Sequence, residues 1–170
     1  MLKQPLISVN MVVYNGEDFL KESIQSIIDQ TYINFEYIIA IGGGKTLDTA
    51  KILKYLLAIK KIKKKLWVIP TIYGSGTEIT SSAVYYVNLR KYSVESIYVV
   101  PDKIINIFKL PKQAPNFFVN VSAMDCLCQS IESIWSLKAN QRSMKLAEKS
   151  FRLSYNFLNT KLITMSKRQQ

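Results

Sequence analysis

The 170-residue sequence contains no histidine. This absence excludes the Ser-His-Asp triad, cysteine nucleophiles activated by histidine, zinc sites with imidazole ligands, and imidazole acid–base catalysis. Cysteine is nearly absent as well, since only Cys126 and Cys128 are present, with one residue between them. That spacing suits neither a disulfide framework nor a CxxC redox motif, so we expect a reducing, cytoplasmic setting.

Long apolar runs are also missing. No uninterrupted apolar stretch reaches the roughly 18 residues that a membrane-spanning helix needs, and the N-terminal residues lack the form of a signal peptide. We therefore expect neither a membrane span nor a secretory leader.

Acidic residues are scarce, because 12 Asp and Glu stand against 23 Lys and Arg, which gives a formal net charge of +11. Such an excess is compatible with binding to nucleic acid or to anionic lipid. The densest basic run, residues 60–65, lies between a predicted helix and a predicted strand and has no interleaved aromatic residues. We interpret it as a solvated turn and expect no specific nucleic-acid partner.

The hydrophobic content of 48% is that of a globular protein. The apolar pattern predicts strands over 6–13, 35–41 and 66–70, and helices over 18–30 and 46–59. This alternation predicts an α/β fold: a parallel, Rossmann-like sheet with helices on both faces. Beyond residue 73 the pattern predicts short strands over 83–88 and 97–100, and then helices over 124–135 and 141–157.

The strongest chemical signal is a glycine run where the second predicted strand meets the second helix, in the stretch YIIAIGGGK. Gly42, Gly43 and Gly44 allow a sharp turn and a close approach by a ligand. The following helix directs free N–H groups and its positive end to the same point. Lys45 adds positive charge, and Asp48 offers an acceptor to a ribose or an amide. The stretch predicts a pyrophosphate site; a tight strand–helix turn without a ligand is the alternative.

A second polar loop, PTIYGSGTE, follows the third predicted strand. Loops at the carboxyl ends of parallel strands line one crevice, so we expect this loop and the triple glycine to face the same ligand. Thr71, Ser75 and Thr77 offer hydroxyl groups to phosphate oxygens. A polar surface loop is the alternative interpretation.

Several motifs, in order, resemble the iron-containing (group III) alcohol dehydrogenases over about residues 37–153. The matching stretches read IIAIGGGKTLDTAK, VIPTIYGSGTEITSSAV, RKYSVES, PDKII and AMDCLCQSIESIWS. The resemblance implies interconversion of a small alcohol and an aldehyde with NAD or NADP as the cofactor. It also implies a divalent iron that polarises the substrate oxygen. A homo-oligomer is compatible with it.

The resemblance also assigns cofactor positions. The three glycines resemble the pyrophosphate loop, and Asp48 resembles the acid that helps to hold the dinucleotide. Thr71, Ile72 and Thr80 resemble nucleotide-contacting positions of the second loop. Lys91 resembles a lysine near the adenine ribose.

The metal site is where the sequence departs from this family. The family holds its metal with one Asp and three His, and Asp125 resembles the first ligand. The position four residues later, on the same helix face, is Gln129, whose amide oxygen binds divalent iron less well than an imidazole does. The remaining ligands have no counterpart here, so the metal set is incomplete, which argues against turnover. A helix acid capped by backbone is the alternative for Asp125.

Residues 1–36 resemble a different family. PLISVNMVVYNGEDFLKESIQSIIDQTYINFEYII is similar to the start of family-two glycosyltransferases, where this strand and helix help to seat the uracil and ribose of a sugar nucleotide. In place of the acids that follow in those enzymes, this chain has AIGGG. Two alternatives therefore stay open: a glycosyltransferase remnant that binds a sugar nucleotide, and a non-catalytic fusion or fragment.

The sequence thus predicts three parts. They are a glycosyltransferase-like strand–helix unit over 1–36, a nucleotide-binding α/β domain over 37–121, and a partial helical metal-binding domain over 122–170.

Overall fold

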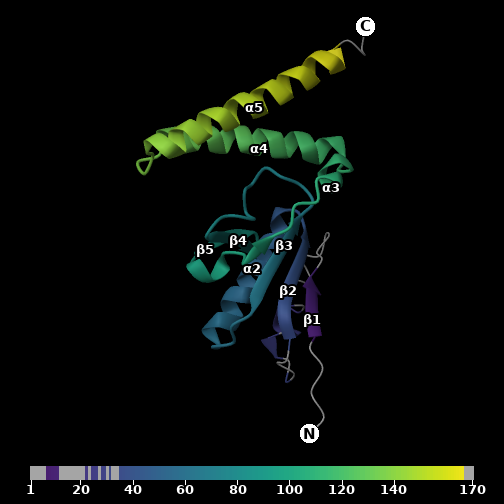
Figure 1. Ribbon diagram of the computed structural model, residues 1–170, viewed down its shortest axis with the longest axis vertical. Coiled ribbons are helices and arrows are strands. Elements are labelled where there is room, and N and C mark those ends of the chain that lie inside the picture. The colour runs from purple at the N-terminus through teal and green to yellow at the C-terminus, as the bar shows by residue number, and fades with distance from the viewer. Residues whose placement is uncertain are drawn as a thin grey trace. The chain divides into compact units, whose positions relative to one another are not determined.

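The computed structural model describes residues 7–11, 22, 24–26, 28, 29, 31 and 35–166. The chain divides into two compact units. The N-terminal unit comprises Met1–Thr71 and Gly76–Pro111, and the C-terminal unit comprises Ile72–Ser75 and Lys112–Gln170. Figure 1 shows a sheet with a covering helix in the former and long helices in the latter. The three predicted parts remain a prediction about family resemblance.

A four-stranded parallel sheet, in the order β1-β2-β3-β6, forms the base of the N-terminal unit. Its strands are β1 (Ile7–Met11), β2 (Phe35–Gly42), β3 (Lys65–Pro70) and β6 (Lys103–Ile104). The predicted parallel α/β class is confirmed. Because Gly42 pairs with Pro70 in the register, β2 and β3 end side by side (Figure 1).

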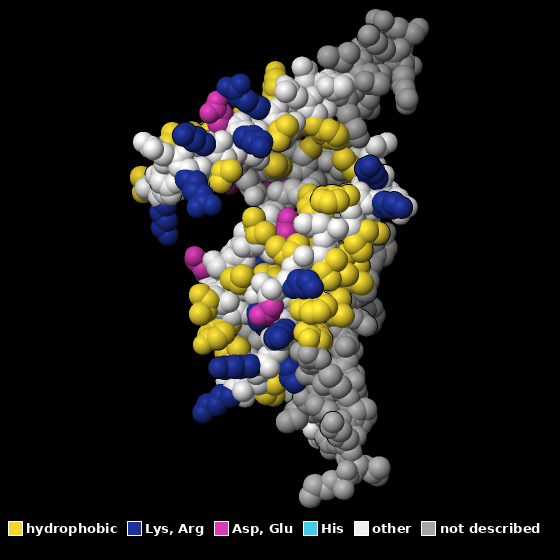
Figure 2. All heavy atoms as spheres, in the orientation of Figure 1, with side chains coloured by type: hydrophobic (Ala, Val, Ile, Leu, Met, Phe, Trp, Pro, Cys, Tyr) yellow, Lys and Arg dark blue, Asp and Glu magenta, His cyan; other side chains and the backbone are white. Residues whose placement is uncertain are grey.

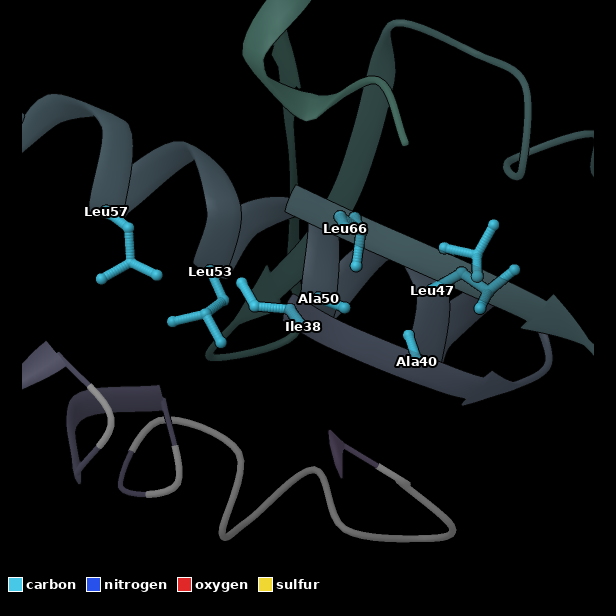
Figure 3. Close-up of a cluster of buried hydrophobic side chains, with 8 residues drawn as sticks. Ile38, Ala40, Leu47, Ala50, Leu53, Leu57 and Leu66 are labelled. Atoms are coloured by element: carbon cyan, nitrogen blue, oxygen red, sulfur yellow. The ribbon is translucent and has the colours of Figure 1, made fainter. Parts of the chain in front are cut away.

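Helix α2 (Gly44–Ile59) covers one face of this sheet. Alternate residues of β2 and β3 point to that face and meet apolar residues of α2 at helical spacing, as Figure 3 shows. The buried cluster comprises Ile38, Ala40, Leu47, Ala50, Leu53, Leu57, Leu66 and Val68. Ile24 and Ile28, from the described part of the preceding helical segment, pack against the same cluster.

An antiparallel hairpin of β4 (Ser82–Val87) and β5 (Arg90–Glu95) packs on α2 through Ala83, which is buried beside Ile52. The hairpin turn consists of Asn88 and Leu89, with φ of 50° and 63°. Positive φ at both positions of a two-residue loop is the signature of a type I′ turn.

The prediction of a strand over residues 97–100 is wrong. Residues Ile97–Val99 form a 3-10 helix, η1, in which the Ser96 hydroxyl accepts a hydrogen bond from the Tyr98 N–H at 3.2 Å. Val99 is fully buried, whereas Ile97 is 78% exposed. This apolar run therefore anchors the segment through the buried side chain of Val99 and does not form a strand.

Lys54 and Asp102 link α2 to the segment before β6. Their Nζ and Oδ2 atoms lie 2.7 Å apart, and Asp102 also accepts the Leu66 N–H at 2.7 Å. Burial raises the pKa of Asp102, but the hydrogen bonds from Lys54 and Leu66 outweigh it, so the pKa lies below its ordinary value.

The C-terminal unit is helical. After α3 (Lys109–Lys112) come α4 (Asn116–Trp135) and α5 (Gln141–Ser166). α4 begins eight residues before the predicted helix, and α5 extends beyond its predicted end. The hydroxyl of Ser130 joins the two long helices by donating to Ser150 Oγ at 2.8 Å.

Large apolar side chains on α4 and α5 are exposed, among them Phe117 (70%), Trp135 (73%) and Leu153 (63%). Within the described part of the chain, no helix is both long and apolar enough to cross a membrane. Basic side chains outnumber acidic ones on the face drawn in Figure 2, as the composition leads one to expect.

Candidate functional site

The junction of β2 and α2 presents an uncapped helix N-terminus. Gly43 is the N-cap residue, with φ −81° and ψ −172°, and no side chain caps the helix. The first N–H groups of a helix have no partner within it. The first turn contains no acidic residue, so the positive end of the helix dipole is not neutralised there by a carboxylate. These features suit an anion such as a phosphate.

Gly42 has a packing role. A Cβ atom at this position would lie 2.5 Å from Oγ1 of Thr46, which is closer than side chains approach each other. The buried Thr46 of α2 therefore occupies the space that the missing side chain leaves. Close approach by a ligand remains a prediction for Gly43 and Gly44.

The second polar loop begins next to the triple glycine. The Thr71 N–H donates to the carbonyl oxygen of Gly42 at 3.0 Å, which joins the ends of β3 and β2. Ile72 and Ser75 belong to the C-terminal unit. In that unit, a Cβ on Gly74 would lie 2.6 Å from the carbonyl oxygen of Ser122, so the loop backbone packs directly on α4.

The loop returns to the N-terminal unit at Gly76, whose φ of +67° lies in the region that favours glycine. The next residue, Thr77, is buried, and its hydroxyl donates a hydrogen bond to the Asp48 carboxylate on α2. The Val84 N–H also donates to Asp48. The side chain of Asp48 is only 14% exposed, so this predicted cofactor residue is engaged by the chain itself.

Lys51 lies at the centre of these contacts, although it is absent from the predicted site residues. Its side chain is fully buried and its Nζ donates to the carbonyl oxygens of Thr77, at 2.7 Å, and Ser82. It also donates to the hydroxyls of Thr77, at 3.2 Å, and Thr80, at 3.1 Å. Asp48 Oδ1 lies 3.9 Å from the same nitrogen. We call Asp48, Lys51, Thr77, Thr80 and Ser82 the Lys51 cluster.

Burial shifts both ionisable groups of the cluster toward neutrality. It raises the pKa of Asp48, against the opposing effects of the Thr77 hydroxyl, the Val84 N–H and Lys51. It lowers the pKa of Lys51, against the opposing charges of Asp48 and Glu78. The hydrogen bonds and the mutual attraction offset the cost of burying two charges.

The remaining predicted residues lie on three different elements. Lys45 is exposed on the first turn of α2, and Lys91 is exposed on β5. Asp125, half-buried, and Gln129, exposed, lie one turn apart on α4.

These two side chains do not fit an iron ion by themselves, because one carboxylate and one amide are too few and too weak as donors. Among the described residues, no group of three or more His, Cys, Asp or Glu side chains could hold a metal.

The family model described as iron-containing alcohol dehydrogenase matches residues 3–106. This range includes most of residues 1–36, whose motifs resemble the start of family-two glycosyltransferases.

Individual proteins named as an alcohol dehydrogenase and a reductase also match this chain. An alcohol dehydrogenase from Thermococcus barophilus is 27% identical over 143 residues, which are 72% of this chain and 38% of that protein. The structure of a sulfoacetaldehyde reductase from Bifidobacterium kashiwanohense in complex with NAD+ is similar, with a TM-score of 0.71 and 21% identity. It matches over 84% of this chain and 41% of that one. The likeness confirms the fold, and the chain spans less than half the length of these proteins.

An uncharacterized glycosyltransferase from Haemophilus influenzae is 44% identical over 72 residues. These residues are 42% of this chain and 21% of that protein. The predicted resemblance of part of the chain to glycosyltransferases is therefore confirmed.

Proposed function

This chain belongs to the iron-containing alcohol dehydrogenase family, and we propose that its N-terminal unit binds NAD(H) or NADP(H). The observation that carries the proposal is the uncapped N-terminus of α2 beside the end of β3, with the Thr71 N–H bonded to Gly42. The backbone N–H groups of Gly43 and Gly44 bind the pyrophosphate, and Lys45 adds positive charge. Thr71, Thr80 and Lys91 complete the proposed set within this unit, whereas Ile72 and Ser75 belong to the C-terminal unit.

For the whole protein, we propose interconversion of an alcohol and an aldehyde. The bound dinucleotide supplies hydride transfer, and the residues of this chain hold and orient it. No step is assigned to iron, because Asp125 and Gln129 do not form a set that fits the ion. The 170 residues therefore account for dinucleotide binding and not for turnover.

Titration of the chain with NADH, followed by energy transfer from tryptophan, tests the proposal. We expect saturable binding that Gly43→Val weakens by about tenfold or more, because a branched side chain at the N-cap blocks access to the first helical N–H groups. Ala58→Val, near the other end of the same helix, adds a comparable side chain away from the site and should bind as the unchanged chain does.

A parallel titration with UDP separates the second candidate, a sugar-nucleotide site, which the match to the Haemophilus influenzae protein favours. Binding of UDP without binding of NADH would replace the dehydrogenase proposal. Loss of NADH binding in both valine variants would show that the effect is not specific to the helix N-terminus.

A further inference from the structure

Lys51 connects α2 to the segment 77–82 at three places along that segment. Its Nζ reaches the carbonyl oxygen and hydroxyl of Thr77, the hydroxyl of Thr80 and the carbonyl oxygen of Ser82. These acceptors are 26 to 31 residues from Lys51 in sequence. One ammonium group therefore fixes the return of the second loop against the helix whose N-terminus is the proposed pyrophosphate site.

The cluster also determines where two proposed cofactor residues point. The Thr80 hydroxyl accepts from Lys51 and lies 3.2 Å from the carbonyl oxygen of Ser82, to which it donates. The Asp48 carboxylate accepts from Thr77 and from the Val84 N–H. The Thr80 hydroxyl is thus engaged within segment 77–82, and the Asp48 carboxylate of α2 is engaged by Thr77 and Val84. The effect of both side chains on a ligand therefore passes through the position of the backbone.

We propose that Lys51 is a positioning residue for dinucleotide binding, which holds segment 77–82 at a fixed place relative to the N-terminus of α2. This inference rests on the proposed function. Loss of the ammonium group removes the hydrogen bonds that the carbonyl oxygens of Thr77 and Ser82 accept from Lys51, and it removes the positive charge beside the Asp48 carboxylate in a buried place. The segment then leaves its position, and the ligand has to restore it on binding, which weakens the affinity.

Lys54 provides a matched control one turn further along α2. Its Nζ donates to the carbonyl oxygen of Val100 and to Asp102, both at 2.7 Å, and does not bond to segment 77–82. Lys51→Met and Lys54→Met shorten the same side chain in the same helix and each removes a long-range tie. Comparison of the two separates loss of stability from loss of loop position.

The experiment measures NADH affinity and amide hydrogen exchange for both variants, at a temperature where both are folded by circular dichroism. We expect Lys51→Met to weaken NADH binding by about tenfold or more and to speed exchange in segment 77–82. Lys54→Met should keep the affinity of the unchanged chain. Equal affinity in Lys51→Met and the unchanged chain would overturn the inference alone. Absence of NADH binding by the unchanged chain would overturn the proposed function and this inference with it.

Should Lys51→Met not fold, Thr77→Val tests the same cluster, because it removes the hydroxyl shared by Asp48 and Lys51. Weaker NADH binding and faster exchange in segment 77–82 support the inference. Unchanged affinity would reject it.

Discussion

At the scale of single residues, Gly42 and Gly76 are required for different physical reasons. A Cβ on Gly42 would collide with Thr46, whereas a Cβ on Gly76 would meet nothing within 4 Å. Gly76 instead has a φ of +67°, which L residues rarely adopt. The first position is therefore restricted by space and the second by backbone conformation.

We predict that Gly42→Ala lowers the free energy of unfolding by about 2 kcal/mol, because it overpacks the start of α2. Adding Thr46→Ala should restore part of the loss, since the three atoms nearest to the new Cβ all belong to the Thr46 side chain. Gly76→Ala should cost about 1 kcal/mol, and Thr46→Ala should not relieve it. Urea unfolding measures the free energy of unfolding of Gly42→Ala and Gly76→Ala, each with and without Thr46→Ala. An equal effect of Thr46→Ala on the two glycine variants would contradict the distinction.

Single residues also show which parts of the candidate site could be predicted from the sequence and which could not. The glycine run predicts the helix N-terminus because it lies between two strongly patterned elements. The role of Lys51 is not predictable in the same way, since lysine is a surface residue in most contexts. Its acceptors come from a loop whose path depends on tertiary packing. The spacing of Asp48 and Lys51, three residues apart on α2, is the one local signal that the pair shares a helix face.

At the scale of elements, long apolar patterns are predictable and short polar ones are not. The strand predicted over 35–41 and the helix predicted over 46–59 correspond to β2 and α2, which are anchored by buried residues on one face. β5 escapes prediction because its sequence, RKYSVE, is largely exposed and has little apolar alternation. Its position depends on pairing with β4 and on a turn that lacks the usual glycine.

That turn leads to a prediction at the same scale. Leu89 is 98% exposed with a φ of 63°, so its side chain packs on little while its backbone is in an unfavourable region. Leu89→Gly creates the Asn-Gly pair that type I′ turns favour and should raise the free energy of unfolding by about 1 kcal/mol. Leu137→Gly is the matched control, because Leu137 is also exposed but is not among the residues with positive φ in the described chain. A gain from both substitutions would refute the turn argument.

At the scale of the whole molecule, the two compact units carry different fractions of the proposed chemistry. The N-terminal unit contains the α2 N-terminus and the Lys51 cluster, and the C-terminal unit contains Asp125 and Gln129. The N-terminus of α2 suits an anion. Asp125 and Gln129 together offer too few ligands for an iron ion. The chain should therefore respond to dinucleotide and not to metal.

Thermal unfolding in the presence of each ligand tests that difference. A ligand at about 100 times its dissociation constant stabilises the folded state by about 2.7 kcal/mol, which corresponds to a Tm increase of about 5 to 10 °C for a chain of this size. We expect NADH to produce such a shift in the unchanged chain and none in Gly43→Val. Ferrous ion under anaerobic conditions should leave the Tm unchanged, because a carboxylate and an amide bind it too weakly to compete with water. A metal-dependent increase that Asp125→Asn abolishes would show that the ligand set is larger than these two residues.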